Sequence, residues 1–301
     1  MPTQKKTTAL YHPKHWPMWL LVGFLQLLVL LPHGLLIRLG KGLGHIVLKF
    51  AGRRRHIAAA NIKLCFPHLS EQEQQQLLTK IFEENCAGYL EAFSAWLKPG
   101  AIANIHVNGL ENLKALQRDP KGVILIGAHY TTIDIAARLT GQTLKLNGIY
   151  RPQNNAVVNH VMERGRSRFL ESELINQHDF RGMVKCLKQG RTLWFPADQD
   201  HGAKNSVFAP FFGVNAATLD MPTRLAKLTG ANVVFASYFR RPDNSYEVTF
   251  THLNEFTGTD KLADAILLNR TLEKSLEQYP AQYMWVHRRF KTRPEGEPSV
   301  Y

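Results

Sequence analysis

Short apolar runs rich in β-branched and aromatic residues alternate with helical patterns through the second half of the chain. The apolar runs lie at 122–127 (GVILIG), 144–150 (LKLNGIY), 191–195 (RTLWF), 231–239 (ANVVFASYF) and 246–253 (YEVTFTHL). Patterns typical of helices separate them, at about 131–140, 154–169, 179–188 and 218–229, and a last one covers about 261–278. Alternation of this kind predicts an α/β fold, with a mixed sheet flanked by helices.

A helical stretch precedes the predicted sheet. Apolar residues recur at helical spacing before Pro67, and Ser70 with Glu73 forms a capping-box pattern that begins a second helix. The pattern changes after Pro99 and Gly100. We therefore expect a helical prelude at 54–98 and a single α/β domain at 51–301 that includes it.

The first 50 residues are typical of a membrane-anchoring segment. Residues 16–37 read WPMWLLVGFLQLLVLLPHGLLI, carry no formal charge if His33 is neutral, and are about long enough to cross a hydrocarbon core of roughly 30 Å. Pro32 interrupts the run, so a helix lying in the interface is one alternative, and a buried helix of a soluble protein is another. We predict an anchoring segment at 1–50 with a candidate transmembrane helix at 16–37.

Charged and aromatic residues around this segment predict its orientation. Trp16 and Trp19 suit one membrane interface, and basic residues gather beyond the other end, namely Arg38, Lys41, Lys49, Arg53, Arg54 and Arg55. Fewer basic residues, Lys5, Lys6 and Lys14, flank the opposite end. Because basic flanks favour the cytoplasmic side, we expect the α/β domain to face the cytoplasm.

The charge of the whole chain is strongly basic. It has 37 lysines and arginines against 24 aspartates and glutamates, a formal net charge of +13 spread along the chain. This surplus predicts an acidic partner: nucleic acid, an anionic lipid, a phosphorylated glycolipid or an acidic carrier protein. No RNP, zinc-finger or basic-zipper pattern supports nucleic acid. The cysteines, Cys65, Cys86 and Cys186, form no CxxC pair, which indicates a reduced, cytosol-facing protein.

A histidine and an aspartate follow the first apolar strand. GVILIG ends at Gly127, so His129 leaves the carboxyl end of a strand, the edge at which open α/β sheets bind ligands. A tight turn can bring Asp134 against His129 Nδ1, which fixes the tautomer that leaves Nε2 free as a base. Such a base removes the proton of an alcohol that attacks a thioester, and contributes about 10²- to 10⁴-fold. The spacing alone also fits a histidine bonded to the backbone and an aspartate that caps its own helix.

Motifs along nearly the whole chain resemble the lipid A late acyltransferases of the lysophospholipid acyltransferase superfamily. They are HYTTID, NIKLCFP (61–67), YRPQNN (150–155), RGRSRF (164–169), FRGMVKCLKQG (180–190), FPADQDHG with SVFAPFFG, and QYMWVHRRFKTRPEGEPS near the end. The resemblance implies a glycerolipid acyltransferase-like fold at a bacterial inner membrane. It implies transfer of an acyl chain, laurate as a family-level expectation, from acyl carrier protein to a 3-hydroxyacyl chain of Kdo2-lipid IVA.

The resemblance also assigns site residues. It implies that His129 is the base and Asp134 its orienting carboxylate, although this branch often carries glutamate at that position. Arg166 and Asp198 match residues that are functionally important in the branch. Arg166 can bind a phosphate or stabilise charge on the thioester oxygen, and Asp198 can orient Arg166 or a neighbouring backbone. Because Asp198, Asp200 and His201 lack the spacing of a zinc site, we expect no metal and no cofactor.

Further residues are expected to contact the substrates. Candidates for phosphate or Kdo contacts are Arg151, Arg168, His287, Arg288 and Arg289. Phe208, Phe211 and Phe212 are candidates for an acyl-chain pocket, with ordinary core packing as the alternative. Two rival functions stay open: an acyltransferase that acylates lysophosphatidate or another lysolipid, and a non-enzymatic basic membrane-surface protein.

Overall fold

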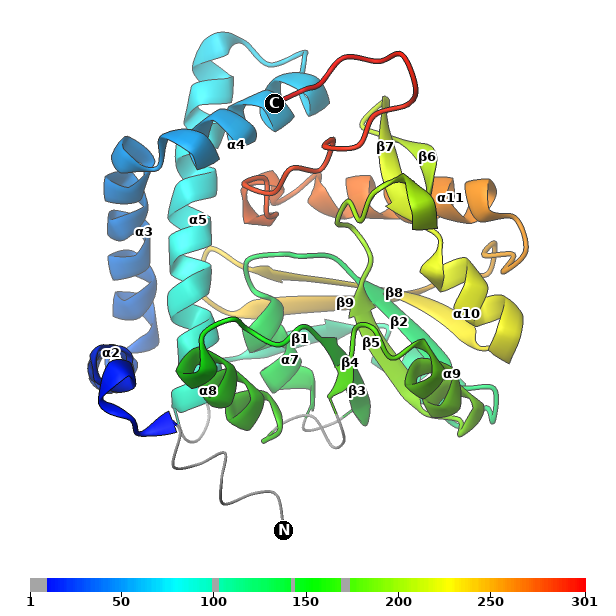
Figure 1. The fold of residues 1–301 in the computed structure, drawn as a ribbon, viewed down its shortest axis with the longest axis horizontal. Helices are drawn as coiled ribbons and strands as arrows, with labels where there is room; N and C mark the ends of the chain where they lie inside the picture. The colour runs from blue at the N-terminus through cyan, green and yellow to red at the C-terminus, as the bar shows by residue number, and fades with distance from the viewer. Residues whose placement is uncertain (1–9, 99–102, 142–143, 169–173) are drawn as a thin grey trace.

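The structure, a computed structural model, describes residues 10–98, 103–141, 144–168 and 174–301. Within these ranges seven strands form one sheet in the order β1-β9-β8-β2-β5-β3-β4 (Figure 1). Their bounds are β1 (Ile105–Asn108), β2 (Val123–Gly127), β3 (Leu146–Tyr150), β4 (Ile175–Asn176), β5 (Thr192–Pro196), β8 (Asn232–Arg240) and β9 (Tyr246–His252). β2 pairs parallel with β5 and β8, whereas β8 and β9 are antiparallel. The predicted mixed α/β sheet is confirmed.

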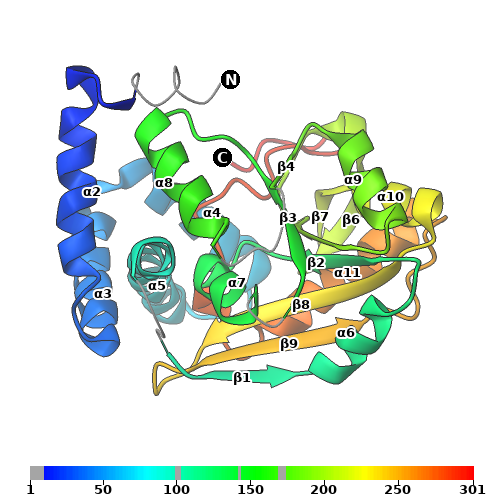
Figure 2. The same ribbon diagram turned by 90° about the horizontal axis from the view of Figure 1, so that it is seen from below.

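Helices cover both faces of this sheet. On one side α5 (Glu71–Leu97) packs against α7 (Ile133–Gly141) and α8 (Ala156–Arg166), and on the other α9 (Phe180–Lys188) packs against α10 (Met221–Thr229). Figure 2 shows these two groups on opposite sides of β2, β3 and β4. The central strand β2 is buried at every position, as its continuous apolar run predicts. Two further helices are α6 (Leu110–Gln117) and α11 (Lys261–Leu276).

A separate hairpin stands beside α11. It consists of β6 (Ser206–Phe211) and β7 (Val214–Leu219), which pair antiparallel and pack on α11. The two residues between the strands, Phe212 and Gly213, have φ values of 49° and 76°. Positive φ at both central positions is typical of the tight turns that match the twist of a hairpin. The predicted phenylalanine run 208–212 therefore belongs to this hairpin.

The N-terminal part is helical, as predicted for the prelude. α2 (Trp16–Leu28), α3 (His33–Phe50) and α4 (Gly52–Cys65) precede α5, with single-turn 3₁₀ helices at Pro13–His15, Ala203–Asn205 and Pro280–Gln282 elsewhere. The capping box at Ser70 is confirmed, because its backbone N–H donates to Glu73 Oε2 at 2.8 Å and its hydroxyl accepts from Glu73 N at 3.3 Å. The division into 1–50 and 51–301 stays a prediction.

The predicted single transmembrane helix at 16–37 is wrong. α2 ends at Leu28 and α3 begins at His33, because Pro32 cannot continue a helix through its own missing N–H. In the part of the chain that the structure describes, every helix is either too short or too polar to cross a membrane. α3 instead packs along α5, and the two backbones approach so closely that a Cβ at Gly40 would lie 2.5 Å from Ala87 Cα.

Candidate active site

His129 and Asp198 meet at the carboxyl edge of the sheet. β2 and β5 run parallel with Gly127 opposite Pro196, so the two residues follow neighbouring strand ends. His129 Nδ1 lies 2.7 Å from Asp198 Oδ1, and the backbone N–H of His129 donates to the same oxygen at 3.1 Å. The side chain of His129 is 24% exposed, whereas that of Asp198 is only 4% exposed. A buried carboxylate thus holds a partly open imidazole.

The surroundings keep Asp198 ionised. Burial raises the pKa of Asp198, but the His129 imidazole, the hydrogen bonds from His129 and a hydrogen bond from Tyr283 outweigh it and lower the pKa to about 2. An ionised carboxylate on Nδ1 favours the tautomer with its proton on that nitrogen, which leaves Nε2 as the basic atom. The arrangement is that of a general base with an orienting carboxylate.

The predicted contact between Asp134 and His129 is wrong. Asp134 lies in the first turn of α7 and forms a bidentate ion pair with Arg166 of α8, with Arg166 Nε 2.7 Å from Oδ1 and Nη2 3.0 Å from Oδ2. Of the two roles predicted for Asp198, orienting Arg166 is wrong, whereas orienting a neighbouring backbone is confirmed by the bond from the His129 N–H. The predicted pairing is thus reversed, because Asp198 contacts His129 and Asp134 contacts Arg166. Asp198 follows β5, the strand next to β2, and lies directly on the Nδ1 side of His129.

Helix α5 packs against Asp134 and against the turn that carries His129. The indole N–H of Trp96 donates to Asp134 Oδ1 at 3.0 Å, and Arg166 Cζ lies 5.8 Å from the centre of the Trp96 ring. At Gly88 of α5 a Cβ would lie 2.5 Å from the carbonyl oxygen of Thr131, two residues after His129. The long helix therefore contacts both the turn that carries His129 and the Asp134–Arg166 pair. Neither Trp96 nor Gly88 had a motif that pointed to it.

The C-terminal segment closes over the turn that carries His129. Tyr130 and Tyr283 form an isolated antiparallel bridge, in which Thr131 N donates to Gln282 O at 2.8 Å and Met284 N donates to His129 O at 3.0 Å. A second attachment is at Asp200, which accepts from the backbone N–H of Thr292 at 2.6 Å. Residues more than 150 positions apart in the sequence thus fix the backbone of His129, and no spacing rule could reveal this.

The predicted basic contacts divide into buried and accessible residues. Arg289 is buried, bonds to Ala217 O at 2.8 Å and lies over the Phe211 ring at 5.2 Å, so its expected surface role is wrong. Arg288 is partly exposed and stacks on Tyr301 at 5.1 Å. Burial lowers the pKa of His287 to about 4, so this side chain is neutral near pH 7 and offers a phosphate no charge. Arg151 and Arg168 are exposed.

The three phenylalanines also differ in burial. Phe211 is fully buried and stacks near Trp285 at 6.2 Å between ring centres, which fits the alternative of ordinary core packing. Phe208 and Phe212 are partly exposed. Among those residues no group of three or more histidines, cysteines and acids is arranged to hold a metal ion.

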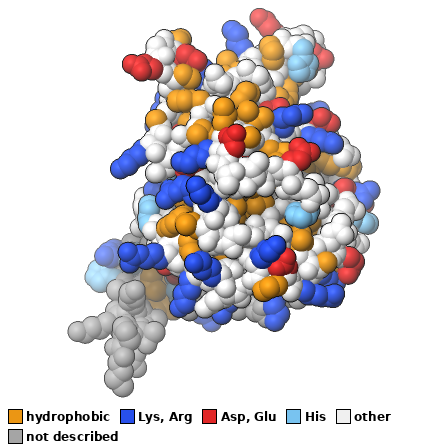
Figure 3. Space-filling model, turned by 90° about the vertical axis from the view of Figure 1, so that its right-hand side faces the viewer, with side chains coloured by type: hydrophobic (Ala, Val, Ile, Leu, Met, Phe, Trp, Pro, Cys, Tyr) orange, Lys and Arg blue, Asp and Glu red, His pale blue; other side chains and the backbone are white. Residues whose placement is uncertain are grey.

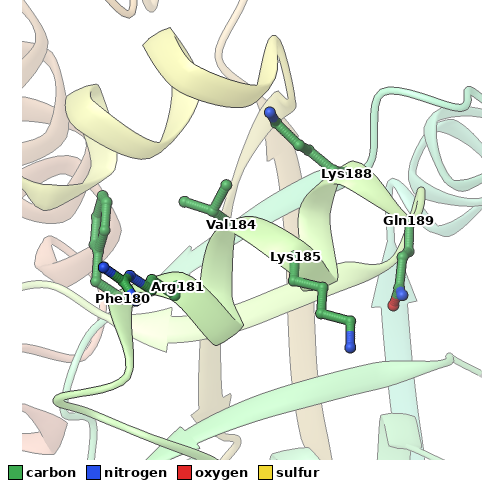
Figure 4. Close-up of a pocket in the computed structure, with 6 residues that line it drawn as sticks. All are labelled: Phe180, Arg181, Val184, Lys185, Lys188 and Gln189. Atoms are coloured by element: carbon green, nitrogen blue, oxygen red, sulfur yellow. The ribbon is translucent and has the colours of Figure 1, made fainter.

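A shallow groove lies along α9, on the face of the sheet that α5 does not cover. Phe180 and Val184 form its apolar part, and Figure 4 shows the side chains that line it: Phe180, Arg181, Val184, Lys185, Lys188 and Gln189. The guanidinium of Arg224 on α10 stacks on Phe180 at 4.8 Å. Figure 3 shows this side of the molecule, where lysine and arginine side chains are spread between apolar patches. The groove is basic and apolar at once.

Comparisons with known proteins match nearly the whole chain to one family. Residues 3–292 match the family described as bacterial lipid A biosynthesis acyltransferase. The chain is 39% identical to the lipid A biosynthesis lauroyltransferase of Escherichia coli (strain K12), over 99% of this chain and 98% of that protein. It is 37% identical to the palmitoleoyltransferase of the same strain, over 100% and 99% of the two chains. A solved 1-acyl-sn-glycerophosphate acyltransferase of Thermotoga maritima aligns with 81% of this chain and 99% of its own at 13% identity, with a TM-score of 0.40.

Proposed function

The chain belongs to the bacterial lipid A biosynthesis acyltransferase family, and we propose that it transfers laurate from acyl carrier protein to a 3-hydroxyacyl chain of Kdo2-lipid IVA. The observation that supports this reaction most directly is the hydrogen-bonded pair of His129 and Asp198 at the strand edge, 2.7 Å between Nδ1 and Oδ1. The pair supplies the base that an alcohol needs to attack a thioester. The lauroyltransferase relative at 39% identity favours laurate as the acyl chain.

The proposed mechanism is a direct transfer within a ternary complex. His129 Nε2 takes the proton of the acceptor hydroxyl while its oxygen attacks the thioester carbonyl carbon. The carbon–sulfur bond then breaks, and the imidazolium returns the proton to the departing thiolate. Asp198 stays ionised and stabilises the imidazolium, because its pKa is lowered to about 2. No residue carries the acyl group at any step of this mechanism, so no acyl-enzyme accumulates.

Arg166 has a second proposed role, the binding of an anionic group. Asp134 occupies Nε and Nη2 of its guanidinium, and 23% of the side chain is exposed. The remaining N–H donors can bind a phosphate of the acceptor, for which a planar guanidinium with fixed donors is well suited.

The decisive experiment is acyl transfer in detergent. The native protein is expected to add one laurate from lauroyl acyl carrier protein to Kdo2-lipid IVA, and His129→Ala to lose this activity by about 10²-fold or more. His178→Ala, at an exposed histidine before α9, is the matched control and should remain active. If palmitoleate is transferred faster than laurate, the reaction class stands and the acyl chain changes. Acylation of lysophosphatidate without lipid IVA acylation would favour the rival reaction.

The donor is proposed to dock on the groove along α9. Arg181, Lys185 and Lys188 border its apolar part, which complements an acidic protein surface that also carries apolar residues. Exposed charge pairs contribute about 0.2–1 kcal/mol each, so Arg181→Ala with Lys185→Ala should raise the KM for acyl carrier protein about three- to tenfold. The control is Arg270→Ala with Lys274→Ala on α11, which removes the same exposed residue types at the same spacing. Equal KM values for the two double variants would remove α9 as the docking site.

Attachment to the cytoplasmic face of the inner membrane is also proposed. Large apolar side chains are exposed all along α2 and α3, including Trp16, Leu20, Phe24, Leu27, Leu39, Leu43, Ile46 and Phe50. Figure 1 shows these two helices at the left edge of the molecule, away from α9 and α10 at the right. A continuous apolar face of this kind, with Arg38 and Lys49 on the same helix, suits the interface of an anionic bilayer.

A further inference from the structure

Trp96 contacts both members of the Asp134–Arg166 pair. Its indole N–H donates to Asp134 Oδ1 at 3.0 Å, the same oxygen that accepts from Arg166 Nε at 2.7 Å. The Arg166 guanidinium lies 5.8 Å from the centre of the Trp96 ring, a distance at which a cation and an aromatic face attract each other. One side chain of α5 thus acts on a carboxylate of α7 and a guanidinium of α8 together.

Trp96 is itself held in a fixed position. Gly165, next to Arg166, packs directly on it, because a Cβ at this glycine would lie 2.5 Å from Trp96 Cβ. Phe93, one turn earlier on α5, meets the indole edge-to-face with 5.4 Å between ring centres. Trp96 also packs against a small cluster formed by Val22 of α2 and Val157 of α8. The indole of Trp96 can therefore orient Asp134 and Arg166 without moving itself.

The indole N–H of Trp96 is a third hydrogen bond to the Asp134 carboxylate, beside the two from Arg166. Asp134 is buried, and a buried carboxylate needs its oxygen atoms satisfied by donors. If Arg166 alone supplied them, the carboxylate and the guanidinium could turn together as one coplanar unit. The indole N–H fixes the plane of the Asp134 carboxylate, and the bidentate geometry then fixes the plane of the Arg166 guanidinium.

We propose that Trp96 is a positioning residue, which orients Arg166 through Asp134 so that the open donors of the guanidinium meet the anionic group of the acceptor. This inference rests on the proposed function, in which Arg166 binds that group. It assigns Trp96 no contact with either substrate. Its effect should therefore appear in the KM for the acceptor, while the KM for the acyl donor stays unchanged.

Steady-state kinetics of Trp96→Phe test the proposal. Phenylalanine keeps an aromatic face for Arg166 and removes the indole N–H together with part of the ring, so the acceptor KM should rise about tenfold, the range expected for a lost hydrogen bond to a charged group. The matched control is Trp19→Phe, which loses an indole hydrogen bond to the carbonyl of Leu10, 2.9 Å long, in the same apolar cluster. Its acceptor KM should stay at the native value.

A double-mutant cycle shows whether Trp96 acts through Asp134. In an Asp134→Ala background, Trp96→Phe should add much less than its tenfold effect, because no oxygen remains there to accept the indole N–H. Fully additive effects would overturn the proposal, and so would a native acceptor KM in Trp96→Phe.

If Trp96→Phe does not fold, Gly165→Ala provides a second route to the same readout. This substitution pushes α8 away from an intact indole and should also raise the acceptor KM, whereas an unchanged KM would overturn the proposal. A native protein that acylates lysophosphatidate instead of lipid IVA would refute the proposed acceptor alone. The acceptor KM of Trp96→Phe is then compared with the native value using lysophosphatidate, which also carries a phosphate, and this comparison tests the role of Trp96.

Discussion

At the scale of single residues, the two aspartates of the site have separable roles. Asp198 holds His129 through Nδ1, whereas Asp134 holds Arg166. Asp198→Asn should lower kcat about 10²- to 10⁴-fold, because asparagine cannot stabilise the imidazolium that forms as the acceptor is deprotonated. Asp134→Asn should act mainly on the KM of the acceptor. Measured kcat and KM values of the two variants decide the assignment, and a larger kcat loss in Asp134→Asn would return the orienting role to Asp134.

The sequence identified the members of the site better than their partners. His129 is hydrogen-bonded to Asp198, and Arg166 forms an ion pair with Asp134. The pairing was wrong because a short spacing suggests a local contact, while the actual partner of His129 arrives from another strand 69 positions later. No sequence motif pointed to Trp96, because a tryptophan within a helical pattern is typical of a core residue.

At the scale of elements, α5 determines where the turn that carries His129 can lie. The backbone of this turn approaches α5 so closely that a Cβ at Gly88 would meet the Thr131 carbonyl at 2.5 Å. Gly88→Ala should therefore cost about 1–3 kcal/mol of unfolding free energy and reduce kcat. Gly42→Ala in α3 is the control, because its Cβ meets open space and alanine favours helix by up to about 1 kcal/mol. Urea denaturation and kcat of both variants test this, and a Gly88→Ala protein as stable and active as Gly42→Ala would contradict it.

Strong local patterns predicted the elements well. The capping box at Ser70 marked the start of α5, and the run of four buried aliphatic residues from Val123 marked β2. The span at 16–37 failed because hydropathy alone does not place a helix end, whereas the proline at 32 does. The strand order, and with it the neighbours β2 and β5, follows from long-range pairing that no local window contains.

At the scale of the whole molecule, exposed apolar residues on α2 and α3 predict how the protein meets a lipid surface. Leu39→Ser with Leu43→Ser should reduce flotation with anionic vesicles several-fold, because each leucine contributes its buried apolar area. The control is Leu228→Ser with Leu262→Ser, at leucines that are 54% and 47% exposed, against 44% and 45% for the test pair. Equal flotation of the two double variants would show that α2 and α3 are not the lipid-binding face.

Histidines buried in the neutral form should make the fold sensitive to acid. Burial lowers the pKa of His33 and of His287, the latter to about 4. Because the unfolded chain binds these protons near pH 6.5, stability is complete above that pH and is lost as the pH falls toward 4. For His287 the full loss amounts to at most about 3 kcal/mol. Urea midpoints at pH 7 and pH 5 measure it: the native protein should lose stability between them, and His287→Gln should lose clearly less. His178→Gln, at an exposed histidine, is the control and should lose as much stability between pH 7 and pH 5 as the native protein. If His287→Gln loses as much as this control, the acid sensitivity must come from other buried groups.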